Sequence, residues 1–206
     1  MIGHQDKSAG WRGSREGWLA AARQALLAGG VDAVKIQPLA QQLQISRTSF
    51  YWFFKDRDDL LNALLAAWEA KNTGAFVQAC GGYADSIAEA VLSLIAMFYS
   101  EEEFEPQLDF AVRSWAHQSA HVTARVHQAD EARLAAICNM FQRFGYAPAL
   151  ADVRARTVYL TQIGYISMQV QESMELRLSR VPAYVETFCG RPPTKAEMAR
   201  FYAQLP

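Results

Sequence analysis

Residues 39–61 of this 206-residue chain read LAQQLQISRTSFYWFFKDRDDLL, and this segment decides the fold of the N-terminal part. Apolar residues at three- and four-residue steps predict a short helix over 36–43 and a second over 47–53 or 47–54, joined by a tight turn at 44–46. The small side chain of Ala40 lies where the two helices must approach closely. Together these features form the helix-turn-helix pattern.

The second helix of this pattern carries residues suited to reading DNA. Ser46 is placed to cap it, and its first turn would enter the major groove, where each base pair presents a distinct set of donors and acceptors. Tyr51 and Lys55 lie four residues apart, so on a helix they would share a face that reaches phosphates. The alternative is a solvated helix start with an ordinary surface pair. The candidate DNA contacts are Arg47, Thr48, Ser49, Tyr51, Trp52, Lys55, Lys35 and Gln37.

The region before this segment predicts one more helix and a basic arm. Ser14 can cap a helix that ends at Gly29. Residues 1–13 contain no apolar run, so we expect a flexible basic arm and neither a signal peptide nor a membrane anchor. Residues 1–55 hold seven basic and three acidic side chains, giving +4, and the rest of the chain therefore carries −5 of the net −1. This asymmetry is typical of a polyanion-binding head on a different body.

Helical periodicity continues through the rest of the chain. From Asp58 a longer helix runs to about residue 72 or beyond and links the head to the body. No stretch predicts a strand, and none reaches the roughly 20 apolar residues of a membrane span. Three cysteines without paired spacing indicate neither a disulfide framework nor a zinc knuckle. We predict an all-α, cytoplasmic protein, with further helices at 83–100, 106–117, 122–144, 148–175, 181–188 and 194–205.

The segment 39–61 resembles the DNA-binding head of the TetR family of transcriptional regulators. The shared features are, in order, a Leu-Ala pair, a turn that ends in Ser46, a Tyr-x-x-Phe-Lys segment at 51–55, and an acidic-Leu-Leu helix start at 59–61. The resemblance covers about residues 14–65. It implies an all-helical homodimer: paired three-helix helix-turn-helix heads read a two-fold operator in double-stranded DNA, and C-terminal helical bundles dimerise, bind a small-molecule effector and release the DNA.

This resemblance predicts a DNA-binding domain at 14–57 and an effector-binding and dimerisation domain at 58–206. Two positions depart from the family pattern. Gln44 replaces the glycine of the turn, so its backbone must take a left-handed conformation at some cost, or the turn must be modified. Lys35 stands where Ser or Thr usually caps a helix, which removes a capping oxygen but places a cation near the phosphates.

The body offers candidates for an effector pocket, because ligand sites between helices are lined by aromatic side chains with a few polar tips. Ordinary core packing is the alternative for each candidate. His117, His121 and His127 lie close in sequence, but neither a cysteine nor a carboxylate pair completes a metal shell, so no metal and no cofactor are expected. The pocket candidates are Trp68, Phe98, Trp115, His117, Tyr159 and Gln162.

Residues 157–171 carry apolar groups on opposite helix faces, so both faces must be covered. Leu160, Gly164, Ser167 and Met168 mark one face, and the other holds Tyr159, Ile163, Ile166 and Val170. We expect one face to pack on its own bundle and the other on a symmetry mate. The alternative is a central helix buried within one subunit. The candidate interface residues are Leu160, Gly164, Ser167, Met168 and Ile166.

These features predict a homodimeric DNA-binding regulator, expected to be a repressor that a small molecule relieves. The alternative is a helical small-molecule binding protein or enzyme without DNA binding. A third possibility is a DNA-organising protein with no ligand. The sequence contains no phosphate loop, no nucleophile with a positioned base and no carboxylate pair of defined spacing, so we do not expect an enzyme.

Overall fold

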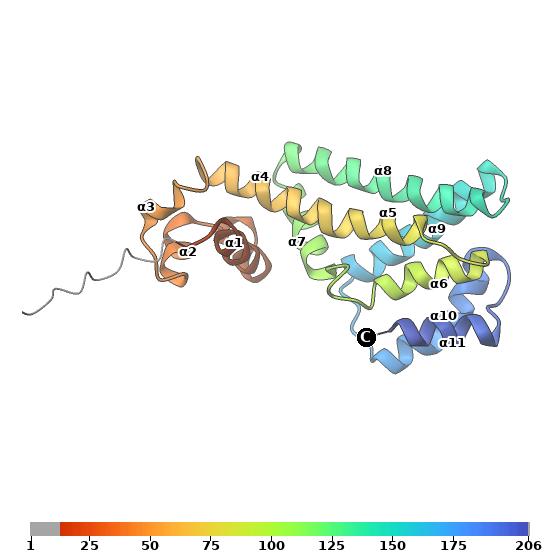
Figure 1. Cartoon of the computed structure of the whole chain (residues 1–206). Helices are drawn as coiled ribbons and strands as arrows, with labels where there is room; N and C mark the ends of the chain where they lie inside the picture. Colours follow the sequence, from red (N-terminus) through yellow and green to blue (C-terminus); the bar gives the residue numbers. More distant parts are fainter. Residues whose placement is uncertain (1–12, 206) are drawn as a thin grey trace, which may run out of the picture. The chain divides into compact units, whose positions relative to one another are not determined.

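The computed structural model describes residues 13–205, which form helices and no strand (Figure 1). The basic arm predicted at 1–13 lies, except for Gly13, outside the described residues. The chain divides into two compact units between Ala67 and Trp68. The sequence predicted the division between residues 57 and 58, at the start of a helix expected from Asp58. In the structure that helix begins at Arg57, and most of it belongs to the N-terminal unit.

The N-terminal unit is built around a cluster of aromatic rings. The Trp18 and Phe50 rings meet edge to face with centroids 5.2 Å apart, and Phe54 stacks on Phe50 at 5.4 Å. All three side chains are buried, so they hold the short helices together despite their few backbone hydrogen bonds. Ser14 caps the first helix by accepting a hydrogen bond from the Gly17 amide, as predicted. The elements are α1 (Arg15–Gly29), the 3₁₀ turn η1 (Val31–Ala33), α2 (Ile36–Gln42), α3 (Arg47–Phe50) and α4 (Arg57–Trp68).

The turn between α2 and α3 has the geometry that the sequence predicted. Gln44 takes the left-handed conformation with φ 55°, and Lys35 precedes α2 without any side-chain cap. Ser46 is the N-cap residue of α3, but its side chain accepts no capping hydrogen bond. Instead, its carbonyl oxygen accepts from Ser49 Oγ at 2.7 Å. The capping role predicted for the Ser46 hydroxyl is therefore wrong.

Helix α3 is shorter than predicted, because it ends at Phe50. The amides of Tyr51, Trp52 and Phe53 donate to carbonyls three residues back, which tightens the chain into turns. The predicted helical face shared by Tyr51 and Lys55 consequently does not form.

Arg57 ties the start of α4 to the loop that precedes α2. Its Nε donates to the Val34 carbonyl and its Nη2 to the Val31 carbonyl, both at 2.6 Å. Val31 and Val34 are both buried, so these acceptors lie within the core of the N-terminal unit. Charged donors to backbone carbonyls form strong hydrogen bonds, so α4 begins as a fixed part of this unit.

The C-terminal unit is a helical bundle (Figure 1). Helix α8 packs along α9, α5 packs against α6 and α8, and α10 and α11 both cover α6. The core between them is apolar and includes Phe76, Leu94, Ile137, Phe141 and Val185. The elements after α4 are the π-helical segment η2 (Glu69–Thr73), α5 (Gly74–Gly81), α6 (Ile87–Met97), α7 (Pro106–Ala116), α8 (Ala120–Arg143), α9 (Pro148–Ser167), α10 (Met174–Cys189) and α11 (Lys195–Gln204). Among the described residues, no helix is both long and apolar enough to cross a membrane.

Helix α9 ends at Ser167, so the single helix predicted over 148–175 is wrong. Gln169 takes a left-handed conformation with φ 50°, and the Val170 amide donates to the Tyr165 carbonyl to close the helix. Ser173 then caps α10 by accepting from the Leu176 amide. This break starts α10 at Met174, well before the helix predicted at 181–188.

Candidate nucleic-acid interface and body pocket

The exposed edge of α3 and the turn after it gather the polar and aromatic side chains that the sequence singled out. Arg47 and Thr48 are exposed, and the exposed fractions of Tyr51 and Trp52 are 51 % and 69 %. The Arg47 Nη2 lies 3.4 Å from the Tyr51 hydroxyl oxygen. Large rings at the surface of a small domain are unusual, since burial of such rings is the main driving force for folding. This edge is therefore a candidate contact surface.

The remaining predicted contacts divide between this edge and the interior. Lys35 and Gln37 are exposed at the start of α2, and Lys55 is exposed after the turn. Ser49 is different, because it is only 4 % exposed and its hydroxyl is bonded to the Ser46 carbonyl. Its side chain therefore braces the start of α3 instead of facing outward.

Residues 19–64 match the family described as bacterial regulatory proteins, tetR family. The N-terminal unit therefore contains a TetR-family DNA-binding domain. With this helix-turn-helix head, the chain is a DNA-binding transcriptional regulator. No curated protein matches its sequence.

Solved structures show that the TetR-family likeness of fold extends over the body. A Mesorhizobium loti structure assigned to the TetR-family transcriptional regulators has a TM-score of 0.65 at 16 % identity, over 85 % of this chain and 95 % of that one. The structure of Mycobacterium smegmatis AmtR has a TM-score of 0.53 at 19 % identity, over 92 % of this chain and 100 % of that one. At these identities the likeness concerns the fold.

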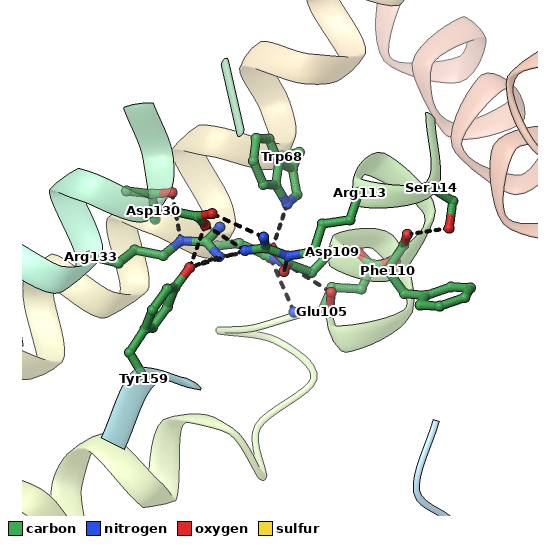
Figure 2. A network of polar contacts seen from close by, with 11 residues as sticks. Trp68, Glu105, Asp109, Phe110, Arg113, Ser114, Asp130, Arg133 and Tyr159 are labelled. Carbon is green, nitrogen blue, oxygen red and sulfur yellow. Dashed lines mark hydrogen bonds and ion pairs between the residues drawn. The ribbon is translucent and has the colours of Figure 1, made fainter. Parts of the chain in front are cut away.

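The body of the chain contains a buried ionic cluster (Figure 2). Asp109 and Arg133 are fully buried, and Arg133 Nη1 lies 2.9 Å from Asp109 Oδ1. Arg113 bonds to the second Asp109 oxygen at 2.8 Å and makes two hydrogen bonds to Asp130, at 2.6 and 3.1 Å. Two arginines thus balance two aspartates. Burial would raise the pKa of Asp109, but Arg133 and Arg113 outweigh it and hold that pKa below its ordinary value.

Two of the predicted pocket residues belong to this cluster. Trp68 Nε1 donates to Asp109 Oδ1 at 2.9 Å, and the Tyr159 hydroxyl donates to Asp130 Oδ1 at 2.6 Å. Both side chains are buried among their partners, so the structure gives them a place in the core. Trp115 is buried on α7 away from the pocket described below, and His117 is exposed at the end of α7. Among residues 13–205 no group of three or more His, Cys, Asp or Glu is placed to hold a metal ion.

A pocket lies between α6, α9 and α10, and two predicted residues, Phe98 and Gln162, line it. The cavity volume of this pocket is about 60 Å³, and the pocket is partly open to solvent. Arg177 reaches it from α10, although the sequence pattern predicted a loop at this position, between helices at 148–175 and 181–188. The α10 lining residues Arg177, Val181, Tyr184 and Phe188 are spaced four, three and four apart, and this helical spacing could have predicted that they share a face. The lining residues that sequence reasoning missed are Ile95, Tyr99, Val158, Thr161, Tyr165, Arg177, Val181, Tyr184 and Phe188.

Helix α9 also presents an apolar stripe to solvent. Leu160 is 61 % exposed and Met168 77 %, and Ser167 and half-buried Gly164 lie beside them. Towards the start of the helix, Leu150 and Val153 extend the stripe. Ile166, which was predicted with the interface group, is buried in the core of its own subunit. Tyr159 is also in that core and Ile163 packs against it, so the two predicted faces are separated as their spacing indicated, with Ile166 on the inner one.

Proposed function

We propose that this chain is a homodimeric repressor that holds a two-fold operator through the exposed edges of its paired heads and leaves the DNA when a small molecule enters the body pocket. The observation that carries the DNA-binding part is the exposed edge formed by Arg47, Thr48, Tyr51 and Trp52 on a rigid aromatic base. A side chain held on such a base loses little conformational freedom when it meets DNA.

The residues of this edge would divide the work of recognition. Arg47, in the first turn of α3, is suited to a guanine edge, and Thr48 to a base or phosphate. Lys35, Gln37, Tyr51, Trp52 and Lys55 would position the head on phosphates and sugars. Ser49 acts indirectly, because its hydroxyl is bonded to the Ser46 carbonyl.

The apolar stripe of α9 is the proposed dimer interface. Its side chains recur on one face of the helix, and an apolar face of this length exposed to water favours association. In a two-fold dimer the same stripe from each subunit would meet its counterpart. The interface proposed here contains Leu150, Val153, Leu160, Gly164, Ser167 and Met168, without Ile166.

The effector would act by shifting the helical run that begins at Arg57, and with it the spacing of the two recognition helices. This run continues through α4, η2 and α5 to Gly81. A coupling of about 1–3 kcal/mol between the two sites would change DNA affinity roughly 5- to 150-fold. Such a change is sufficient for a switch.

Fluorescence anisotropy with DNA from upstream of the coding sequence tests the DNA-binding part. Affinity should fall steeply as salt rises, since bound phosphates release counterions. Arg47→Ala and Lys55→Ala should weaken binding, and Lys55→Ala should reduce the salt slope by about one. Arg200→Ala is the matched control, because it removes the same charge from α11 in the body. Unchanged affinity and slope in both head variants would refute the proposed contacts.

A further inference from the structure

The pocket between α6, α9 and α10 has aromatic walls and one charged side chain. Phe98 and Tyr99 face it from the end of α6, and the Tyr184 and Phe188 rings stack along α10 with centroids 5.5 Å apart and 23° between their planes. Arg177 is the charged residue among the lining side chains. Aromatic walls with a single charged group favour a ligand that is mostly apolar and carries one charge.

The geometry of Arg177 leaves its hydrogen-bond donors unused. Its guanidinium carbon lies 5.1 Å from the centroid of the Tyr99 ring and 5.6 Å from that of Tyr165. A guanidinium contacts rings through its flat face, while its N–H donors point outward in its own plane. Within residues 13–205 the structure gives this guanidinium no hydrogen bond to protein. A planar donor fork in this state matches a carboxylate, which accepts two parallel hydrogen bonds.

Among residues 13–205 no carboxylate lies within ion-pair distance of the Arg177 guanidinium. The neighbouring carboxylate is Glu172, whose Oε1 is already bonded to Arg180 Nη1 at 2.6 Å. Its Oε2 is buried and accepts no hydrogen bond in the described structure. Two arginines therefore face one glutamate, and the local balance is positive.

The tyrosines of the pocket do not neutralise this charge. The Tyr165 and Tyr184 hydroxyls are 2.9 Å apart, and their hydrogen bond, with burial, raises the pKa of Tyr184 to about 12. Burial also raises the pKa of Tyr99. The raised pKa values keep Tyr99 and Tyr184 protonated at neutral pH. One hydroxyl of the Tyr165–Tyr184 pair donates to the other, so only one proton of the pair is left for an acceptor in the pocket.

We infer that the pocket binds a small organic monocarboxylate with a flat aromatic body, whose carboxylate pairs with Arg177 and whose ring lies against the Tyr184 and Phe188 pair. The inference rests on the proposed function in one respect, namely that this pocket is the effector site. Tyr165 and Gln162 line the same pocket and offer further donors.

Isothermal titration calorimetry of the full chain with three probes tests the ligand class: benzoate, 2-naphthoate, and the neutral amide 2-naphthamide. At least one acid should bind, and 2-naphthoate should bind more tightly than its amide. Arg177→Met keeps a long apolar side chain but removes the donors, so it should weaken the acid roughly ten- to hundredfold and leave the amide unchanged. Arg177→Lys keeps the charge but not the two parallel donors of the guanidinium. Its affinity for the acid should lie between those of the unmodified chain and Arg177→Met.

Arg200→Met is the control, because it removes one positive charge on α11, outside the pocket lining. Its affinity for 2-naphthoate should equal that of the unmodified chain. Circular dichroism of each variant verifies folding, and Arg177→Lys keeps the test decisive if Arg177→Met does not fold. Failure of both acids to bind at millimolar concentration, or equal acid affinity in Arg177→Lys, Arg177→Met and the unmodified chain, would overturn the inference.

Anisotropy on the same preparations, without any acid, separates this inference from the proposed function. A chain that binds upstream DNA but neither acid remains a regulator, and only the ligand class is refuted. A chain that binds 2-naphthoate through Arg177 but ignores the DNA refutes the regulator and leaves the pocket chemistry standing.

Discussion

The backbone conformation of a single residue, Gln44, lowers the stability of the folded chain. Its backbone stands at φ 55° with the side chain exposed. This conformation costs a residue with a Cβ about 1–2 kcal/mol of conformational free energy, whereas glycine adopts it without that penalty. The same conformation returns at Gln169 with φ 50°, where it ends α9. Both turns are thus held by the packing of the helices on either side.

Gln44→Gly should raise the free energy of unfolding by about 1 kcal/mol, because the relief of the left-handed conformation exceeds the entropy that glycine adds to the unfolded chain. Urea denaturation followed by circular dichroism measures this change. Gln41→Gly, at an exposed helical position of α2, should instead lower stability by about 0.5–1 kcal/mol. A loss of stability in Gln44→Gly equal to that of Gln41→Gly would show that the turn is not strained.

Asp109 predicts a dependence of stability on pH. Its folded pKa lies below the ordinary value of 3.8, so its stabilising contribution is complete above about pH 4 and is lost as the pH falls towards the folded pKa. Asp109→Asn leaves Arg133 buried beside a neutral group and should lower stability by about 3–5 kcal/mol near pH 7. The difference between the two proteins, measured by urea denaturation, should shrink below pH 4. A difference that stays constant down to pH 2 would contradict this assignment.

At the scale of helices, the sequence pattern predicted elements well where an end has a local chemical signal. Ser14 and Gly30 bound α1, and Pro106 opens α7. The end of α9 has no such signal, because Gln169 takes a conformation that favours glycine. The helix predicted over 148–175 ran past this end and past the start of α10. As a result, Arg177 was not predicted to be helical or to line the pocket. The pocket was predictable only in part for this reason.

The helix-turn-helix motif at residues 36–50 shows a second limit on what the sequence alone can predict. The motif was readable from the sequence, including the strained Gln44, because offsets between residues are local properties. Whether Ser49 points outward depends on the hydrogen bond that its hydroxyl finds, and that bond goes to the Ser46 carbonyl. Spacing alone does not distinguish these outcomes in a helix of four residues.

Arg57 gives a prediction for the joint between η1 and α4. Arg57→Met removes two charge-assisted hydrogen bonds to the Val31 and Val34 carbonyls and should destabilise the N-terminal unit by about 1.5–3 kcal/mol. Thermal unfolding measures this loss, with exposed Lys35→Met as the control that removes a charge without a capping bond. If the two variants melt together, the Arg57 contacts contribute nothing to stability.

At the scale of the whole molecule, the exposed stripe of α9 predicts the oligomeric state. Leu160→Lys should give a folded monomer in sedimentation, because the charge meets its own copy across a two-fold axis. Ile166→Lys should instead impair folding, since that side chain is only 6 % exposed within its own subunit. Val77→Lys, at an exposed apolar position on α5, is the control and should leave the mass unchanged. A Leu160→Lys protein that keeps the mass of the unmodified protein would exclude this face.

Helix α9 contributes Val158, Gln162 and Tyr165 to the pocket and Leu160 and Met168 to the stripe. In the proposed dimer, helix α9 would therefore contact both the bound molecule and the facing subunit. A tilt of α9 when one pocket fills would move α9 of the other subunit. That movement would in turn change the second, empty pocket. Titration of the pair should accordingly be sigmoidal or biphasic, and the monomeric Leu160→Lys protein should give a simple hyperbola.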